Sequence, residues 1–119
     1  SHVSVRQADM YRLPLADASF DAVTLQMVLH YAEDPAAALA EASRTLKPGG
    51  RIVIVDLAPH ARADLLQGQA HRWPGFDDAA LAGWLGAAGC AVATTKKIAG
   101  ALPVSVWVAE RQPAHASLS

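Results

Sequence analysis

The sequence is short of the residues that mark several common protein classes. It holds one cysteine, Cys90, so an internal disulfide is impossible and a reducing compartment, the cytoplasm, is favoured. Aromatic residues make up only 6% of the 119 residues. Lysine plus arginine number 10 against 11 aspartate plus glutamate, and no basic stripe is present. The segment is therefore not expected to bind nucleic acid.

Long hydrophobic runs are also missing. No apolar run reaches the roughly 18–20 residues that a membrane-spanning helix needs. The N-terminus does not show the charged-then-apolar order of a secretory signal. We therefore expect no membrane partner.

The residues that are present fall into alternating strand and helix patterns. Strands are expected at 3–8, 20–29, 52–55, 90–98 and 104–108, and helices at 35–46, 61–71 and 77–88. A strand, a helix, a glycine turn and a second strand over about 35 residues make a βαβ unit. The pattern predicts an α/β fold whose last two strands form a hairpin.

The first long helix has clear start and stop signals. Asp34 is a good N-cap, and Pro35 suits the first helical position. The expected buried face consists of Leu39, Ala42, Ser43 and Leu46. Glu41 and Arg44 are expected on the solvent side, and the sequence 47–50 (KPGG) stops the helix.

Several short motifs occur in a fixed order along the first 50 residues. They are Ala8-Asp9-Met10, Leu13-Pro14, Ser19-Phe20-Asp21, Val28-Leu29-His30-Tyr31, Asp34-Pro35 and Leu46-Lys47-Pro48-Gly49-Gly50. Together they resemble class I S-adenosylmethionine-dependent methyltransferases, in the subgroup related to quinone-biosynthesis methyltransferases. The resemblance implies a Rossmann-like fold with a mixed sheet that ends in an antiparallel hairpin. It covers a domain over residues 1–112, followed by a frayed tail at 113–119.

Two features of that family are absent from the sequence. Neither the glycine-rich loop after the family's first strand nor the acidic residue that ends its second strand is present. Gly49-Gly50 follows a helix and precedes a strand, so this pair is a turn and not a nucleotide-binding loop. We therefore expect the chain to be the C-terminal part of a longer methyltransferase domain, and to be inactive by itself.

The resemblance implies cofactor contacts from two places in the chain. It places the Asp9 carboxylate on the adenine amino group and the Met10 backbone N–H on a ring nitrogen. Gln26 and Met27, at the end of their strand, would face the methionine portion of S-adenosylmethionine. An ordinary turn-capping role for Asp9 and a core position for Met27 remain alternatives.

Histidines and an aspartate near the predicted strand ends are the candidates for chemistry. His60 and His71 are predicted as catalytic residues, because imidazole is suited to general-base work at neutral pH. Their alternative is a hydrogen-bonded structural role, which we favour for His30. A metal site built from Asp56, His60 and His71 matches no dense ligand motif, and none is predicted.

Two functions remain open at this level. The first is methyl transfer to a small-molecule acceptor by the intact parent protein. The second follows from residues 70–89, which resemble the methyltransferase half of bacterial proteins with an N-terminal winged-helix regulator. In that case the domain would sense S-adenosylmethionine or S-adenosylhomocysteine and control transcription.

The missing family strands also predict an assembly. The family's first strand flanks the equivalent of strand 20–29, so we expect that strand to have a bare, hydrophobic edge. The strand at 3–7 normally lies two strands further out and would have lost its neighbour. A homodimer or a strand-swapped assembly through one of these strands is therefore predicted.

Overall fold

The computed structural model describes residues 1–58, 75–101 and 103–113. Its elements are β1 (His2–Ser4), the 3-10 helix η1 (Gln7–Asp9), β2 (Phe20–Gln26), the 3-10 helix η2 (Leu29–Tyr31), α1 (Pro35–Arg44), β3 (Leu46–Leu57), α2 (Asp78–Ala87), β4 (Cys90–Ile98) and β5 (Val104–Arg111). The strands form one sheet in the order β1-β2-β3-β5-β4. β1, β2 and β3 are parallel, and β5 is antiparallel to β3 and β4. The mixed α/β sheet with its terminal hairpin is confirmed.

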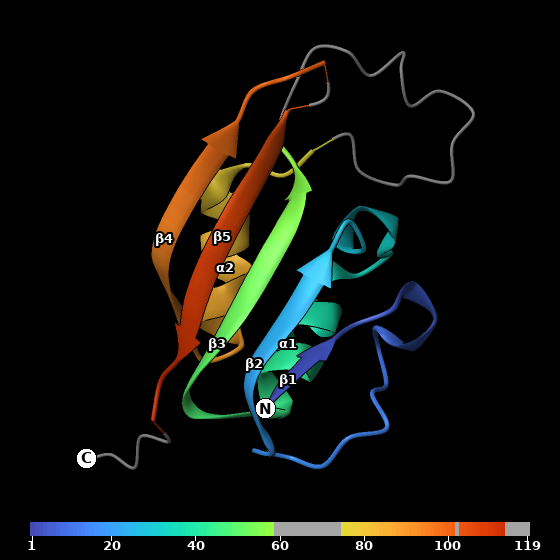
Figure 1. Ribbon diagram of the computed structural model, residues 1–119, viewed down its shortest axis with the longest axis vertical. Helices are drawn as coiled ribbons and strands as arrows, with labels where there is room; N and C mark the ends of the chain where they lie inside the picture. The colour runs from blue at the N-terminus through green and yellow to red at the C-terminus, as the bar shows by residue number, and fades with distance from the viewer. Residues whose placement is uncertain (59–74, 102, 114–119) are drawn as a thin grey trace.

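Both α-helices lie on the same face of the sheet, behind the strands in Figure 1. Each begins at an aspartate whose side chain accepts a backbone N–H of the first turn. Asp34 accepts from Ala37 at 3.2 Å, and Asp77 accepts from Ala80 at 2.7 Å. Gly89 follows α2 with φ +85°, a conformation that suits glycine after a helix end. No helix among the described residues is long and apolar enough to cross a membrane.

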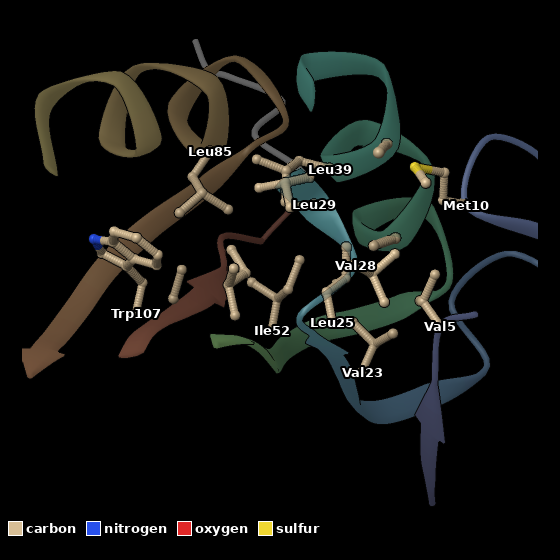
Figure 2. Close-up of a cluster of buried hydrophobic side chains, with 14 of the residues drawn as sticks. Val5, Met10, Val23, Leu25, Val28, Leu29, Leu39, Ile52, Leu85 and Trp107 are labelled. Atoms are coloured by element: carbon tan, nitrogen blue, oxygen red, sulfur yellow. The ribbon is translucent and has the colours of Figure 1, made fainter. Parts of the chain in front are cut away.

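The core lies between the helices and the sheet. Alternate residues of β2, β3 and β5 face the helices, and the register places Ile54 beside both Leu25 and Trp107. Leu39 of α1 and Leu85 of α2 pack toward this row of side chains (Figure 2). All five side chains are completely buried. The helices therefore close one side of the sheet with an apolar layer.

β1 corrects the prediction of a bare edge on β2. Val3 pairs with Val23 in parallel register, and the Val5 N–H continues the pairing by donating to the Thr24 carbonyl at 2.8 Å. β1 therefore occupies the position next to β2 and satisfies part of its backbone. The sheet edges are β1 and β4. Assembly through an edge strand stays a prediction, but β2 is not that edge.

Several sequence-based bounds change: β1 is shorter than the predicted strand 3–8, β3 begins before residue 52, and β5 continues past residue 108. The helix predicted at 61–71 lies outside the described residues. α1 ends at Arg44, and Leu46, expected on the helix, is the buried first residue of β3. β2 ends at Gln26, three residues before the predicted end. Gly50 lies so close to its surroundings that a Cβ there would stand 2.8 Å from the Lys47 carbonyl oxygen. Gly49 and Gly50, predicted as a turn before the strand, lie inside β3, where the pairing with β2 shifts register. The missing side chain at Gly50 lets the backbone of Lys47 and Asp21 approach closely there.

Candidate functional site

The candidate site lies at the carboxyl ends of the three parallel strands. The residues there are Asp9, which follows β1, Gln26 and Met27 at the end of β2, and Asp56 near the end of β3. Because parallel strands point the same way, their carboxyl ends meet at one edge of the sheet. In open α/β sheets this edge is where ligands bind.

Asp9 and Met10 present different groups at this edge. The Asp9 side chain is 37% exposed, and one of its oxygens lies 3.5 Å from Arg6 Nε. Met10 buries its side chain in the core, while its N–H donates to the Gln7 carbonyl at 3.4 Å, long for a hydrogen bond. Asp9 thus offers an accessible carboxylate, and Met10 can offer only its backbone.

Gln26 and Met27 form a sharp exit from β2. Gln26 is exposed and pairs with Val55 of β3, and the Met27 N–H donates to the Val55 carbonyl at 2.7 Å. Met27 has φ +54°, a left-handed conformation that is uncommon for a residue with a side chain. Such backbone strain is found most often at functional sites. The turn directs the chain out of the strand and into η2.

A buried histidine–aspartate pair joins the ends of β2 and β3. His30 Nδ1 lies 2.7 Å from Asp56 Oδ1, and the His30 N–H donates to Asp56 Oδ2 at 3.2 Å. The Leu57 N–H also donates to Asp56 Oδ1, at 2.7 Å. The two side chains are 2% and 0% exposed, so the carboxylate is satisfied inside the protein and not by water.

Sequence reasoning placed both residues near strand ends but did not predict their contact. The signal was present, because His30 and Asp56 follow or end neighbouring parallel strands. The pair fixes η2 against β3 through both a backbone and a side-chain hydrogen bond. This agrees with the structural role favoured for His30.

Comparison with known proteins relates part of the sequence, and most of the fold, to methyltransferases. Residues 1–54 match the family model described as a methyltransferase domain. Over 70 residues the chain is 43% identical to malonyl-[acyl-carrier protein] O-methyltransferase of Hahella chejuensis, covering 59% of this chain and 24% of that protein. It is 46% identical over 54 residues to the ubiquinone/menaquinone biosynthesis C-methyltransferase UbiE of Desulfotalea psychrophila, covering 45% and 22%.

Solved structures share the fold over most of the described chain. The methyltransferase solved with the Haloferax volcanii Trm112 activator has a TM-score of 0.75 and 20% identity, covering 87% of this chain and 59% of that one. The chain has the fold of these methyltransferases, and its first 54 residues match a methyltransferase domain. A methyltransferase from Burkholderia thailandensis, solved with 1,6-didemethyltoxoflavin and S-adenosylhomocysteine, matches with a TM-score of 0.70 and 22% identity, covering 87% and 48%.

The chain is shorter than the curated proteins that it matches. It spans between 15% and 27% of the length of four curated proteins that it matches. The matched family model ends within β3, and the fold match extends over most of the remaining elements. The activity of a whole protein is therefore a proposal and is treated below.

The polar groups at the carboxyl edge of the sheet suit an adenosyl ligand. An adenine amino group is a hydrogen-bond donor, and the partly exposed Asp9 carboxylate is an acceptor. The Gln26 side chain is exposed and supplies both a donor and an acceptor. Met27 is partly buried beside it and adds apolar surface. The residues present therefore fit the contacts expected of them.

Other residues predicted from the sequence are not among those described at the carboxyl edge. His60 and His71 lie outside the described residues, so their catalytic role stays a prediction. Among the described residues no group of three or more His, Cys, Asp or Glu side chains is arranged to hold a metal ion. Cys90 is a buried free thiol whose Sγ lies 3.4 Å from Ser43 Oγ. It is the first residue of β4 and lies against α1, not at the carboxyl edge.

Proposed function

We propose that the protein to which this chain belongs transfers a methyl group from S-adenosylmethionine to a small-molecule acceptor. The 119-residue chain supplies the C-terminal part of the catalytic domain and is not active by itself. The lone cysteine supports a cytoplasmic location. The observation that carries the proposal is the set of polar residues at the carboxyl ends of three successive parallel strands.

The residues of this edge bind and orient the reactants. When bound, S-adenosylmethionine supplies an electrophilic methyl group on a sulfonium, and its transfer leaves a thioether. Asp9 accepts a hydrogen bond from the adenine amino group, and Gln26 and Met27 line the methionine portion. The His30–Asp56 pair holds η2 against β3 and so keeps the turn at Met27 in place. This fixed geometry favours in-line transfer.

The binding step is tested by calorimetric titration of S-adenosylhomocysteine into the longer protein that carries this chain. The Asp9→Asn variant is expected to raise the dissociation constant at least about tenfold, because a charge-assisted hydrogen bond is weakened. Asp21→Asn is the matched control. Asp21 is an exposed carboxylate that lies 3.6 Å from Lys47 Nζ, near the opposite end of β2. It should leave the dissociation constant unchanged.

The transfer step is tested with tritium-labelled S-adenosylmethionine and acceptors from a cell extract. Labelled product from the longer protein, and none from the 119-residue chain, is the expected result. Binding of S-adenosylhomocysteine without transfer to any acceptor would favour the ligand-sensing interpretation instead. Absence of binding by the longer protein would contradict both.

A further inference from the structure

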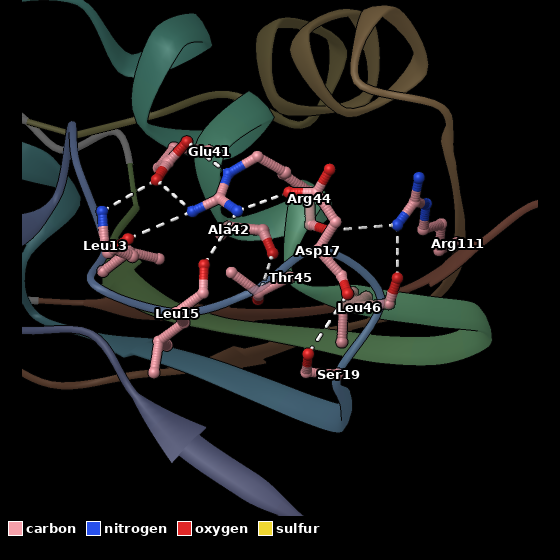
Figure 3. A network of polar contacts seen from close by, with 10 residues as sticks. All are labelled: Leu13, Leu15, Asp17, Ser19, Glu41, Ala42, Arg44, Thr45, Leu46 and Arg111. Atoms are coloured by element: carbon pink, nitrogen blue, oxygen red, sulfur yellow. Dashed lines mark hydrogen bonds and ion pairs between the residues drawn. The ribbon is translucent and has the colours of Figure 1, made fainter.

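The long connection before β2 is held by side chains of α1. Residues 10–19, the connection between η1 and β2, contain no helix or strand. Arg44 donates to the Leu13 carbonyl at 3.1 Å through Nη2 and to the Leu15 carbonyl at 2.8 Å through Nη1. Glu41 Oε2 accepts from the Leu13 N–H at 2.7 Å. Two side chains, one turn apart on α1, thus satisfy the backbone of this connection (Figure 3).

Glu41 and Arg44 also bind each other through two parallel bonds. Arg44 Nε lies 2.9 Å from Glu41 Oε1, and Nη2 lies 2.7 Å from Oε2. Arg44 Nη1 reaches Asp17 Oδ1 at 2.5 Å. The Arg44 hydrogen bonds lower the pKa of Glu41, and the two carboxylates raise the pKa of Arg44. The planar guanidinium makes all these contacts at once, which a lysine ammonium cannot reproduce.

This arrangement corrects the prediction that Glu41 and Arg44 lie on the solvent side. Their side chains are only 17% and 32% exposed, because the connection 10–19 covers them. The helical periodicity correctly puts Glu41 and Arg44 on the face of α1 away from the core. That face is covered by the connection 10–19, whose irregular sequence has no periodicity that would predict its position. The pair therefore has a function beyond solvating the helix.

Asp9 depends on this anchored connection for its position. On its N-terminal side, the pairing with β2 ends at the buried Val5, and η1, which ends at Asp9, buries none of its residues. On the other side of Asp9, the side chains of Met10 and Leu13 are buried in the core. The Arg12 N–H donates to the Asp9 carbonyl at 3.0 Å. The next residue, Leu13, is the one that Glu41 and Arg44 hold at both its N–H and its carbonyl.

We propose that Glu41 and Arg44 are positioning residues for the cofactor. By holding the connection 10–19 on α1, they keep the Asp9 carboxylate at the carboxyl edge of the sheet. They touch neither reactant, so they set the affinity for S-adenosylmethionine and not the rate of transfer from the filled site. The inference rests on the proposed function, because it requires Asp9 to contact the cofactor.

The test compares two arginines that donate to backbone carbonyls. Arg44→Lys in the longer protein is expected to raise the dissociation constant of S-adenosylhomocysteine about tenfold. KM for S-adenosylmethionine should rise by a similar factor, with kcat at saturation within about twofold. Arg111→Lys is the matched control, since Arg111 Nη1 donates to the carbonyls of Leu46 and Arg44, away from Asp9. It should leave both constants unchanged.

A double substitution shows whether Arg44 acts through Asp9. If it does, Arg44→Lys adds little to the effect of Asp9→Asn, because neighbouring residues in one network are not additive. Independent, multiplying effects would overturn the inference. So would an unchanged dissociation constant in Arg44→Lys while the wild-type protein binds. If the wild-type protein does not bind S-adenosylhomocysteine, the proposed function itself fails.

Loss of folding is separated from loss of positioning by a milder variant. Glu41→Gln keeps one acceptor oxygen and is expected to raise the dissociation constant in the same direction by a smaller factor. Amide hydrogen exchange of residues 10–17 should speed up in both α1 variants while exchange in β3 and β5 stays slow. Equal acceleration throughout the sheet would mean that the variants only destabilise the fold, and would overturn the inference.

Discussion

The two faces of the sheet are built from neighbouring residues of the same strands, yet they differ in burial. On β3, Ile54 is completely buried and the next residue, Val55, is partly exposed. On β5, Trp107 is completely buried and Val106 is partly exposed. In the described part of the chain both α-helices lie on one face of the sheet (Figure 1). Ile54 and Trp107 belong to the same buried cluster as Leu39 and Leu85 of these helices. We call the face of Ile54 and Trp107 the helix-covered face, and the opposite face, with Val55 and Val106, the outer face.

The composition of these strands does not distinguish the two faces. Strand 52–55 is continuously apolar, a pattern typical of parallel strands that are covered on both sides. The difference arises from where the helices lie, and helix position depends on contacts between distant segments. The stability of this chain should therefore respond to helix-face substitutions far more than to equivalent ones on the outer face. Two pairs of substitutions compare the faces directly, and two further predictions with smaller expected effects concern the helices that cover one of them.

Trp107→Ala should cost about 3–5 kcal/mol of the free energy of unfolding, the range for removal of a buried aromatic side chain. Trp107 also donates from Nε1 to Asp78 Oδ1 at 2.9 Å, and this bond would be lost. Val106→Ala, one residue earlier on the outer face, should cost about 1 kcal/mol or less. Urea unfolding of the 119-residue chain measures both.

The same two substitutions, made in a longer protein, show whether further chain covers the outer face. If further chain covers the outer face there, the cost of Val106→Ala should rise while that of Trp107→Ala stays the same. Equal costs of the two substitutions in the 119-residue chain would mean that the outer face is already covered, and the contrast between the faces would be wrong.

Polar pairs on the two faces should differ in the same way. The Asp56 carboxylate contacts the N–H groups of His30 and Leu57 and the His30 ring. In Asp56→Asn the amide NH₂ faces one of these groups and cannot accept from it, so the free energy of unfolding should fall by about 2–4 kcal/mol. The outer-face counterpart is Thr24, whose Oγ1 lies 2.7 Å from Nε2 of the exposed His2. Thr24→Val should change the free energy of unfolding by about 0.5 kcal/mol or less.

A similar cost for both polar substitutions would contradict the assignment of His30–Asp56 as the buried pair that joins β2 to β3. The Asp56→Asn variant should also speed amide exchange in η2, since the His30 N–H loses its acceptor. Unchanged exchange in η2 would show that other contacts hold it.

The elements that the sequence predicts well are those defined by local signals. β4 has the predicted bounds, Cys90–Ile98, and α2 begins after Asp77 and ends before Gly89. A cap, a left-handed glycine and a short hairpin loop each depend on residues close in the chain. The carboxyl-edge placement of Asp9 and Gln26 also follows from local elements, given a parallel sheet.

The features that the sequence missed depend on distant partners. The prediction that strand 3–7 lies two strands away from strand 20–29 was wrong, since β1 pairs directly with β2. Which strand pairs with β2 depends on the other strands that are present to compete for its edge. The His30–Asp56 contact joins η2 to β3, and no periodicity encodes it. The burial of Arg44 depends on the connection 10–19, whose irregular backbone has no pattern that predicts its path.

Removal of the N-cap of α2 should lower the free energy of unfolding by less than the core substitutions do. Asp77→Ala removes the acceptor for the Ala80 N–H at the start of α2 and should cost about 1 kcal/mol. Asp77→Ser keeps a capping oxygen and should restore most of that loss. Thermal unfolding compares the two variants. An equal loss in both would mean that Asp77 contributes through its charge and not through the cap.

The smallest expected effect is the dependence of stability on pH through Glu41. The hydrogen bonds from Arg44 lower the pKa of Glu41 from the ordinary value of 4.5, so the folded protein binds this proton less readily than the unfolded chain. The stabilisation is therefore complete above about pH 4.5 and is lost as the pH falls through the lower folded-state pKa. Glu41→Gln should flatten the unfolding free energy over that acidic range, by about 1 kcal/mol or less for a partly exposed ion pair. Parallel profiles for wild type and Glu41→Gln would show that the pair does not link the connection 10–19 to the helix-covered face.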